Sequence, residues 1–180
     1  TFSLHNRAPE PGEIWRSPNH AKTLRLIGET NGRAFYEGEL ADQINAFFKK
    51  HNGYLRKEDL AAYEPEWVQP IRTNYKGYDV WEIPPNGQGL IALIALNILE
   101  ALEIGEKESV ETYHKQIEAI KLAFTDGKAY ITDEGHMSVP TASLLNKTYA
   151  AKRAAEIKDQ ATLPTVGKPV GSGTVYLCTA

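Results

Sequence analysis

Apolar residues recur three or four positions apart through much of the first third of the chain, which predicts amphipathic helices. The first predicted helix begins at Ser17-Pro18, a residue pair typical of a helix start. The second covers residues 34–51 as one long helix, and the third covers residues 55–63, where Pro65 ends it. The pattern therefore indicates a helical beginning.

The pattern changes over residues 67–83, where β-branched and aromatic residues lie on both sides of Lys76-Gly77. This arrangement predicts a β-hairpin, since strands favour such residues and a glycine suits the turn. A Pro/Gly-rich loop at residues 84–89 then leads into a strongly apolar helix over residues 90–102. We expect strand, loop and buried helix to form one unit.

Another amphipathic helix is predicted to begin after Ser109, a suitable N-cap. Its inward face is predicted to consist of apolar residues at helical spacing: Val110, Tyr113, Ile117, Ile120 and Phe124. An alanine-rich helix over residues 147–157 follows, and then a Gly/Pro-rich loop over residues 159–173. Residues 174–180 have the composition of a strand.

The composition indicates a globular protein without a broad basic surface. The 180 residues are 42% hydrophobic and 24% charged, with a formal net charge of -3 and a pI near 6.0. Such a charge does not favour nucleic acid as a partner, and a small-molecule substrate is favoured instead. The apolar run at residues 90–99 is too short for a membrane span and contains Asn97.

Four neighbouring polar residues could in principle bind a metal ion: Asp126, Asp133, Glu134 and His136. Their spacing matches no known metal loop, so we interpret them as a polar turn that ends the preceding helix. We expect no metal site, and the sequence implies no organic cofactor. The single cysteine, Cys178, cannot form an internal disulfide and has no flanking base that would activate it as a nucleophile.

Gly87-Gln88-Gly89 before a helix partly resembles a phosphate-binding loop, because glycines let the backbone approach a phosphate at a helix N-terminus. The third glycine of a dinucleotide loop is missing, and no βαβ pattern surrounds it. We therefore interpret these residues as an ordinary turn that packs against the following helix.

Thr174 attracts attention because of its neighbours. A threonine in a strand usually serves β-propensity alone. Here the Gly/Pro-rich loop ends at Gly173, and Thr174 is the first residue of the predicted strand that follows. A glycine leaves its carbonyl open to attack, and threonine is a known N-terminal nucleophile, so the arrangement suits a precursor that cleaves itself.

Five segments, in order, resemble motifs of the γ-glutamyltranspeptidases, from the C-terminal half of the large subunit into the first residues of the small subunit. They are Phe35-Tyr36-Glu37-Gly38-Glu39-Leu40-Ala41, Gly53 with Glu58-Asp59-Leu60-Ala61-Ala62-Tyr63, Tyr75-Lys76-Gly77-Tyr78 with Pro84-Pro85 and Gly87-Gln88-Gly89-Leu90, Leu96-Asn97-Ile98-Leu99-Glu100, and Glu118-Ala119-Ile120-Lys121-Leu122-Ala123-Phe124-Thr125-Asp126.

This resemblance implies an α+β fragment of the αββα sandwich of N-terminal nucleophile hydrolases, mostly helical with a hairpin and a C-terminal strand. Residues 1–173 would be the C-terminal part of the large subunit and residues 174–180 the start of the small subunit. The precursor would cut itself between Gly173 and Thr174, and Thr174 would then be the catalytic nucleophile. As an isolated piece, the fragment is expected to be inactive, because Thr174 stays blocked by Gly173 and most of the predicted sheet is absent.

The resemblance further implies an enzyme that transfers a γ-glutamyl group, from a substrate such as glutathione, to water or an amino acid. Its other partners would be the remainder of its own two subunits. Val175 and Tyr176 depart from the family's usual threonine and histidine, Gly127 replaces an arginine, and Asn86 and Gln88 replace serines.

These departures are typical of a divergent bacterial or archaeal branch and leave the acyl group open. The alternatives are a related amidohydrolase, such as a glutaryl (cephalosporin) acylase or a poly-γ-glutamate-processing enzyme, and a non-catalytic helical scaffold. The compartment, periplasmic, secreted or cytoplasmic, also stays open.

Overall fold

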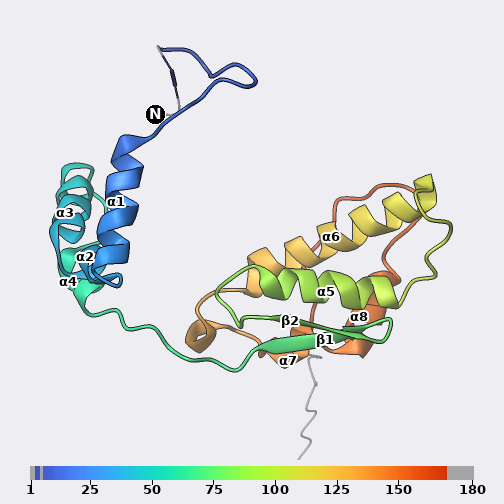
Figure 1. Ribbon diagram of the computed structural model, residues 1–180. Helices are drawn as coiled ribbons and strands as arrows, with labels where there is room; N and C mark the ends of the chain where they lie inside the picture. Colours follow the sequence, from blue (N-terminus) through green and yellow to red (C-terminus); the bar gives the residue numbers. More distant parts are fainter. Residues whose placement is uncertain (1–2, 5, 170–180) are drawn as a thin grey trace, which may run out of the picture. The chain divides into compact units, whose positions relative to one another are not determined.

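The computed structural model describes residues 3–4 and 6–169, which form two compact units divided after Glu66. The first unit is helical, in agreement with the prediction. Its elements are α1 (Pro18–Glu29), α2 (Arg33–Tyr36), α3 (Glu39–Lys50) and α4 (Lys57–Ala61) (Figure 1). Ala34, Ala41 and Leu60 are its buried apolar residues, so its core is small.

The single helix predicted over residues 34–51 is wrong, because the chain breaks it at Gly38. Glu37 and Gly38 leave the helical conformation, with φ of -123° and -99°. Gly38 lies so close to the preceding turn that a Cβ atom there would meet Ala34 Cα at 3.2 Å. The glycine therefore permits a tight corner between α2 and α3 that a larger side chain would open.

The predicted hairpin of the second unit is confirmed. Strands β1 (Ile71–Tyr75) and β2 (Tyr78–Glu82) pair antiparallel, with Ile71 opposite Glu82 and Tyr75 opposite Tyr78. The two turn residues, Lys76 and Gly77, have φ of 50° and 88°. Two successive positive φ values are typical of the type I′ turn, whose twist matches that of paired strands.

Helix α5 (Gly89–Glu100) is the centre of the second unit and is the apolar helix predicted at residues 90–102. It contacts α6 (Val110–Tyr130), α8 (Lys147–Ala154) and β1, so that it is covered on several sides (Figure 1). A 3₁₀ turn, η1 (Glu134–His136), and the short helix α7 (Thr141–Leu144) connect α6 to α8. The residues that form the core are Leu90, Ile91, Ile94, Ala95, Ile98, Ala119, Leu122, Ala123, Leu144, Ala150 and Ala154.

Asn97, the polar residue in the apolar run, joins three elements inside this core. Its side chain accepts hydrogen bonds from Thr73 Oγ1 of β1 and from Lys147 Nζ of α8, and it donates to the Leu145 carbonyl at 3.0 Å. A buried amide is tolerated when its donors and acceptors are satisfied. The network explains why an asparagine lies in a helix that is otherwise apolar.

Ser109 caps α6 as predicted, since its hydroxyl accepts from Thr112 N at 3.1 Å. The predicted inward face is wrong: within the described part of the chain, Val110 is 87% exposed and Ile117 56% exposed, and the other three residues of that stripe are exposed as well. The face that is buried carries small residues instead, among them Ala119, Ala123 and Gly127. Small side chains let α5 and α6 lie close together. The spacing of large apolar residues along the sequence does not show this preference.

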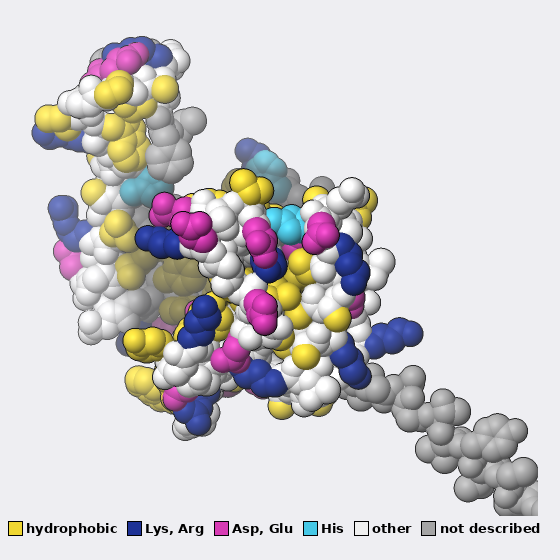
Figure 2. All heavy atoms as spheres, turned by 90° about the vertical axis from the view of Figure 1, so that its right-hand side faces the viewer, with side chains coloured by type: hydrophobic (Ala, Val, Ile, Leu, Met, Phe, Trp, Pro, Cys, Tyr) yellow, Lys and Arg dark blue, Asp and Glu magenta, His cyan; other side chains and the backbone are white. Residues whose placement is uncertain are grey.

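Exposed apolar side chains are visible on the surface, between the charged ones, in Figure 2. Along α5 and α6, Leu96, Leu99, Ile120 and Phe124 line a shallow apolar hollow of roughly 400 Å³. Contiguous exposed apolar surface usually marks a region that contacts further protein. This hollow is the kind of surface that a fragment of a larger sandwich exposes.

Gly127 shows why the arginine that the resemblance leads one to expect does not fit here. A Cβ atom at this position would lie 2.6 Å from Ile91 Cγ1 and 2.7 Å from Ile91 Cδ1. We expect Gly127→Arg to lower the free energy of unfolding by about 1–3 kcal/mol or more, because Ile91 is buried and must be displaced. Urea unfolding of Gly127→Arg, with and without Ile91→Ala, checks this; strictly additive effects of the two substitutions would contradict a direct clash.

Candidate functional site

The predicted processing bond between Gly173 and Thr174 lies outside the described residues, as do Val175, Tyr176, Cys178 and the predicted final strand. The structure does describe the chain that leads toward that bond. After α8, residues 158–167 run along α6, and we call them the α6-bound segment (Figure 1). All of this segment except Lys158 falls within the loop predicted at residues 159–173.

The α6-bound segment runs parallel to α6, because its contacts advance in the same order along both. Near the start of α6, His114 Nε2 lies 2.6 Å from the Lys158 carbonyl oxygen. Later along the helix, Asp126 binds Gly167. The helix rises about 18 Å over these twelve positions, and nine residues of extended chain span at most about 30 Å, so the segment has limited slack.

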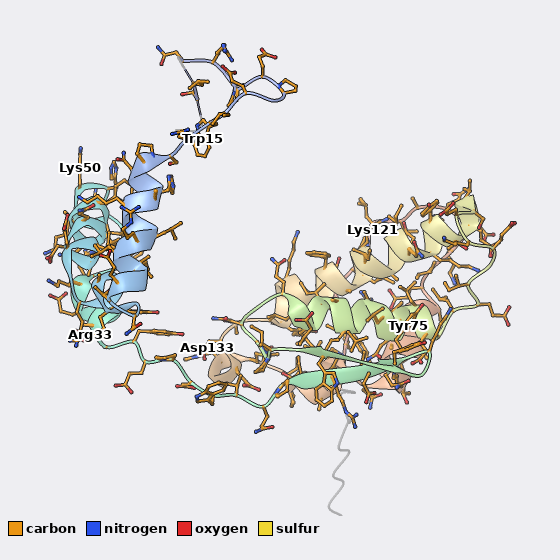
Figure 3. The ribbon with its side chains drawn as sticks, in the orientation of Figure 1. Trp15, Arg33, Lys50, Tyr75, Lys121 and Asp133 are labelled. Carbon is orange, nitrogen blue, oxygen red and sulfur yellow. The ribbon has the colours of Figure 1, made fainter. Side chains whose placement is uncertain are left out.

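Thr162 is held in the middle of the segment by two neighbouring charges. Glu118 Oε2 accepts from Thr162 Oγ1 at 3.2 Å and from Thr162 N at 3.4 Å. Lys121, which projects from α6 (Figure 3), donates to the Thr162 carbonyl and pairs with Glu118 at 2.6 Å. Both the N–H and the carbonyl of Thr162 are therefore bound to α6.

Gly167 is the buried end of the segment, and its backbone is bound on both sides. Its N–H donates to Asp126 Oδ1 at 2.8 Å, and its carbonyl accepts from Tyr130 Oη at 2.6 Å. The second Asp126 oxygen accepts from Tyr149 Oη at 2.7 Å. A fully buried carboxylate thus binds a backbone amide and a phenol at once.

Arg153 supplies the positive charge that this buried carboxylate requires. Its Nε lies 3.1 Å from Asp126 Oδ2, and both side chains are almost completely buried. The guanidinium also forms two hydrogen bonds with Glu156 and one, of 2.9 Å, with the Thr165 carbonyl. Arg153 therefore connects α6, α8 and the segment, as the fork geometry of arginine allows.

Tyr149 is a permanent donor in this cluster. Burial first, and then the hydrogen bond to the Asp126 carboxylate, raise the pKa of the Tyr149 phenol above its usual range. The phenol stays protonated at every pH at which the protein would work. Tyr149 therefore keeps the proton that it donates to Asp126 throughout that range.

Glu118 behaves in the opposite way and gives a pH-dependent contact. Burial alone would raise the pKa of Glu118, but the hydrogen bonds from Lys121 and Thr162 outweigh it, and the pKa lies below the ordinary 4.5. A carboxyl whose pKa is lower in the folded state stabilises that state above its ordinary pKa, and this stabilisation is lost as the pH falls through the folded-state value.

We therefore expect Glu118→Gln to be less stable than the wild type at pH 7, by about 1–3 kcal/mol. The difference should shrink as the pH falls below 4.5 toward the folded-state value. Urea unfolding at several pH values between 7 and 3 measures it. A difference that does not change with pH would contradict the assigned ion pair.

The interpretation of Asp126 as part of a polar turn is wrong. Helix α6 continues past it to Tyr130, and Asp126 is fully buried against Arg153. Asp133, Glu134 and His136 do form the polar turn after the helix: they are exposed, and Asp133 is labelled there in Figure 3. Within residues 3–4 and 6–169, no group of three or more His, Cys, Asp or Glu side chains is arranged to hold a metal ion.

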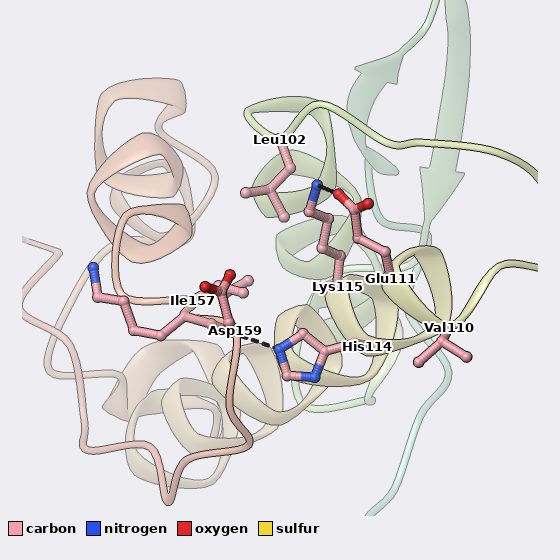
Figure 4. Close-up of a pocket in the computed structure, with 8 residues that line it drawn as sticks. Leu102, Val110, Glu111, His114, Lys115, Ile157 and Asp159 are labelled. Atoms are coloured by element: carbon pink, nitrogen blue, oxygen red, sulfur yellow. Dashed lines mark hydrogen bonds and ion pairs between the residues drawn. The ribbon is translucent and has the colours of Figure 1, made fainter.

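A surface hollow of roughly 530 Å³ lies where the segment begins (Figure 4). Leu102, Val110 and Ile157 supply its apolar walls, and His114 and Asp159 line it too. In the close-up, the labelled His114 reaches the chain at Lys158, so this side chain holds the segment. We assign the hollow no chemistry.

The residues that hold the segment were not recognised as functional from the sequence. Glu118, Lys121 and Asp126 do fall in a motif that carries the family resemblance, and that motif was the available signal. No sequence pattern indicated the role of Tyr149 and Arg153, because their partner, Asp126, lies more than twenty residues away in the chain. Residues 85–88 form a turn as predicted, but Gly89 already begins α5, and its close contact is with β2: a Cβ on Gly89 would meet Glu82 Oε2 at 2.4 Å.

The fold is an α+β fragment of an N-terminal nucleophile hydrolase, as the solved structures that resemble it show. Its described part carries an anchored segment that leads toward Gly173 and Thr174. The chain belongs to the gamma-glutamyltranspeptidase family, whose model matches residues 1–180. The predicted fold class and family are thereby confirmed, and the family is one of enzymes.

Three relatives illustrate the range of this family. The crystal structure of a cephalosporin acylase from Bacillus halodurans is 61% identical, with a TM-score of 0.77 over 91% of this chain and 30% of that chain. The gamma-glutamyltranspeptidase of Helicobacter pylori is 31% identical, with a TM-score of 0.68 over 89% of this chain and 47% of that chain. The glutathione hydrolase-like YwrD proenzyme of Bacillus subtilis strain 168 is 40% identical over 97% of this chain.

The present chain spans about a third of the length of the B. subtilis relative, 34%. Among the helices of the described residues, none combines the length and the apolar character that crossing a membrane requires.

Proposed function

We propose that the chain is part of a precursor that cuts itself between Gly173 and Thr174, and that Thr174 is the nucleophile of the resulting enzyme. The observation that carries this proposal is the family match over residues 1–180, together with a Gly-Thr bond where the resemblance implies one. The relative from B. subtilis is named a proenzyme, which supports a processed precursor. Residues 1–173 and 174–180 would then belong to different subunits.

The proposed processing step uses the Thr174 hydroxyl, the Gly173 carbonyl and one water molecule. The Thr174 hydroxyl attacks the Gly173 carbonyl, the peptide C–N bond breaks, and the acyl group passes from nitrogen to oxygen as an ester. Water then hydrolyses that ester and leaves a free carboxylate on Gly173. The new α-amino group of Thr174 has a reference pKa near 7.7–8.0, so it can act as the base for its own hydroxyl.

We propose γ-glutamyl compounds such as glutathione as the substrates of the mature enzyme. Thr174 would accept the γ-glutamyl group as an acyl-enzyme and pass it to water or to an amino acid. The similarity to a gamma-glutamyltranspeptidase and to a glutathione hydrolase-like protein supports this reading.

A second candidate is a glutaryl amidohydrolase. The 61% identity to a cephalosporin acylase, above that of the other two relatives described, specifically favours it. The two candidate acyl groups differ by one α-amino group, which glutaryl lacks. A site that binds this ammonium group with buried polar side chains would reject glutaryl strongly, while a site that lacks them would not.

Hydrolysis of γ-glutamyl anilide against glutaryl anilide separates the two candidates. The complete gene product is purified after processing, and the released aniline, quantified by chromatography, gives kcat/KM for each substrate. A ratio above about ten in favour of the γ-glutamyl compound supports the first candidate, and the inverse ratio supports the acylase. A protein that remains one chain and hydrolyses neither substrate would refute both candidate activities. The remaining alternative would then be the non-catalytic helical scaffold.

A further inference from the structure

Polar contacts, rather than burial of apolar side chains, hold the α6-bound segment in place. Leu163 is 95% exposed and Val166 47% exposed, so neither contributes to the core. Gly167, by contrast, is buried and bound through both its N–H and its carbonyl. The segment is therefore fixed most firmly at its last position before Lys168.

The binding site for Gly167 accepts glycine only. A Cβ atom at this position would lie 2.0 Å from Tyr149 Oη and 2.9 Å from Arg153 Cδ. Both neighbours are themselves fixed by Asp126, so neither can move away cheaply. The four side chains Asp126, Tyr130, Tyr149 and Arg153 thus form a seat for one backbone position, which we call the Gly167 seat.

We propose that the Gly167 seat is a positioning device for self-cleavage: it fixes the chain just upstream of the bond between Gly173 and Thr174. This inference rests on the proposed function. Six residues of chain separate Gly167 from Gly173 and reach at most about 20 Å, so the seat limits where the scissile bond can lie. Asp126 and its neighbours are positioning residues, because they do not touch the reacting atoms.

The expected effect follows from the length of chain that must be ordered. With Gly167 seated, about six residues connect a fixed point to Gly173; with the seat empty, the nearest remaining anchor is Thr162, bound by Glu118 and Lys121, and about eleven residues do. Because the probability of closing a flexible loop falls with the 3/2 power of its length, emptying the seat slows cleavage by about 2.5-fold. Lost orientation of the peptide adds to this factor.

The seat should affect processing and not the mature activity. Once the bond after Gly173 is cut, Gly167 and Thr174 belong to different chains, and the seat no longer connects to the nucleophile. A positioning role therefore predicts a slower cleavage with unchanged kcat of the cleaved enzyme. A purely structural role predicts instead a lower unfolding midpoint and a lower yield of active protein.

Gly167→Ala tests the proposal, because it blocks the seat while Asp126 keeps both Tyr149 and Arg153. Leu163→Ala is the matched control: it lies in the same segment and is exposed. Tyr130→Phe is a milder second variant that removes one hydrogen bond to the Gly167 carbonyl. The complete gene product is made by pulse-labelled cell-free translation, and the decay of the precursor band gives the cleavage rate.

We expect cleavage at least about 2.5-fold slower in Gly167→Ala, a smaller slowing in Tyr130→Phe, and wild-type rates in Leu163→Ala. The kcat of each cleaved protein on γ-glutamyl or glutaryl anilide should equal that of the wild type. Wild-type cleavage rates in both Gly167→Ala and Tyr130→Phe would overturn the seat while leaving the proposed function intact. A wild-type precursor that never splits would overturn the proposed function itself, and the seat's role with it.

Discussion

Replacing Thr174 with alanine in the complete gene product should leave a single uncleaved chain and lower hydrolytic activity by at least about a thousandfold. Alanine has no hydroxyl to attack the Gly173 carbonyl, and no nucleophile to form the acyl-enzyme afterwards. Gel electrophoresis with intact mass measures the chain composition, and anilide hydrolysis measures the activity. This is the largest effect that the proposed mechanism predicts.

Two matched variants make the result specific to this hydroxyl. Thr174→Ser keeps a hydroxyl at the same position and should still be cleaved, though more slowly. Thr148→Ala removes an exposed threonine from α8 and should be processed like the wild type. A Thr174→Ala protein that still splits at the same bond would exclude the assigned nucleophile.

The second large effect is expected at Asp126. Asp126→Ala should lower the free energy of unfolding by about 3–5 kcal/mol, because it leaves the buried charge of Arg153 without its fully buried carboxylate partner. It also removes the acceptor for Tyr149 Oη and for the Gly167 amide. Urea unfolding in the Thr174→Ala background keeps the protein a single chain during the measurement.

The control for Asp126 is an exposed ion pair on the same helix. Glu111 pairs with Lys115 near the start of α6 and is 66% exposed, so Glu111→Ala should cost no more than about 1 kcal/mol. If Asp126→Ala proved as mild as Glu111→Ala, the buried cluster would contribute little, and the Gly167 seat would lose its physical basis.

Local signals made several elements predictable. The hairpin depended on two residues, Lys76 and Gly77, whose conformation sets the turn without help from distant chain. Ser109 marked the start of α6 for the same reason, since an N-cap acts on the three residues that follow it. The strongly apolar helix α5 was recognisable because few other segments could fill the core.

The errors arose where tertiary contacts decide. Gly38 breaks a helical pattern through its contact with Ala34, and the hydrophobic period alone does not show that contact. Helix α6 has one face of large apolar residues and one face rich in small residues. Helix α5 packs against the small-residue face, because small side chains let the two helices lie closer together. Apolar character therefore identified the helix but not its buried side.

The candidate site divides in the same way. The resemblance pointed to Gly173 and Thr174 and to the motif that contains Glu118, Lys121 and Asp126. Their role as anchors for the segment became visible only once α6, α8 and the segment were placed together, because Asp126 and Gly167 are forty-one positions apart. Contacts between residues this far apart in the chain leave no local sequence pattern from which they can be predicted.

The most direct test of the account is the first residue of the smaller chain made from the complete gene product. The protein is purified, its chains are separated, and the smaller one is examined by N-terminal sequencing and intact mass. The account predicts a chain that begins Thr174-Val175-Tyr176, with Gly173 at the end of the larger one. A smaller chain that begins at any other residue, or a protein that stays in one piece, would contradict it.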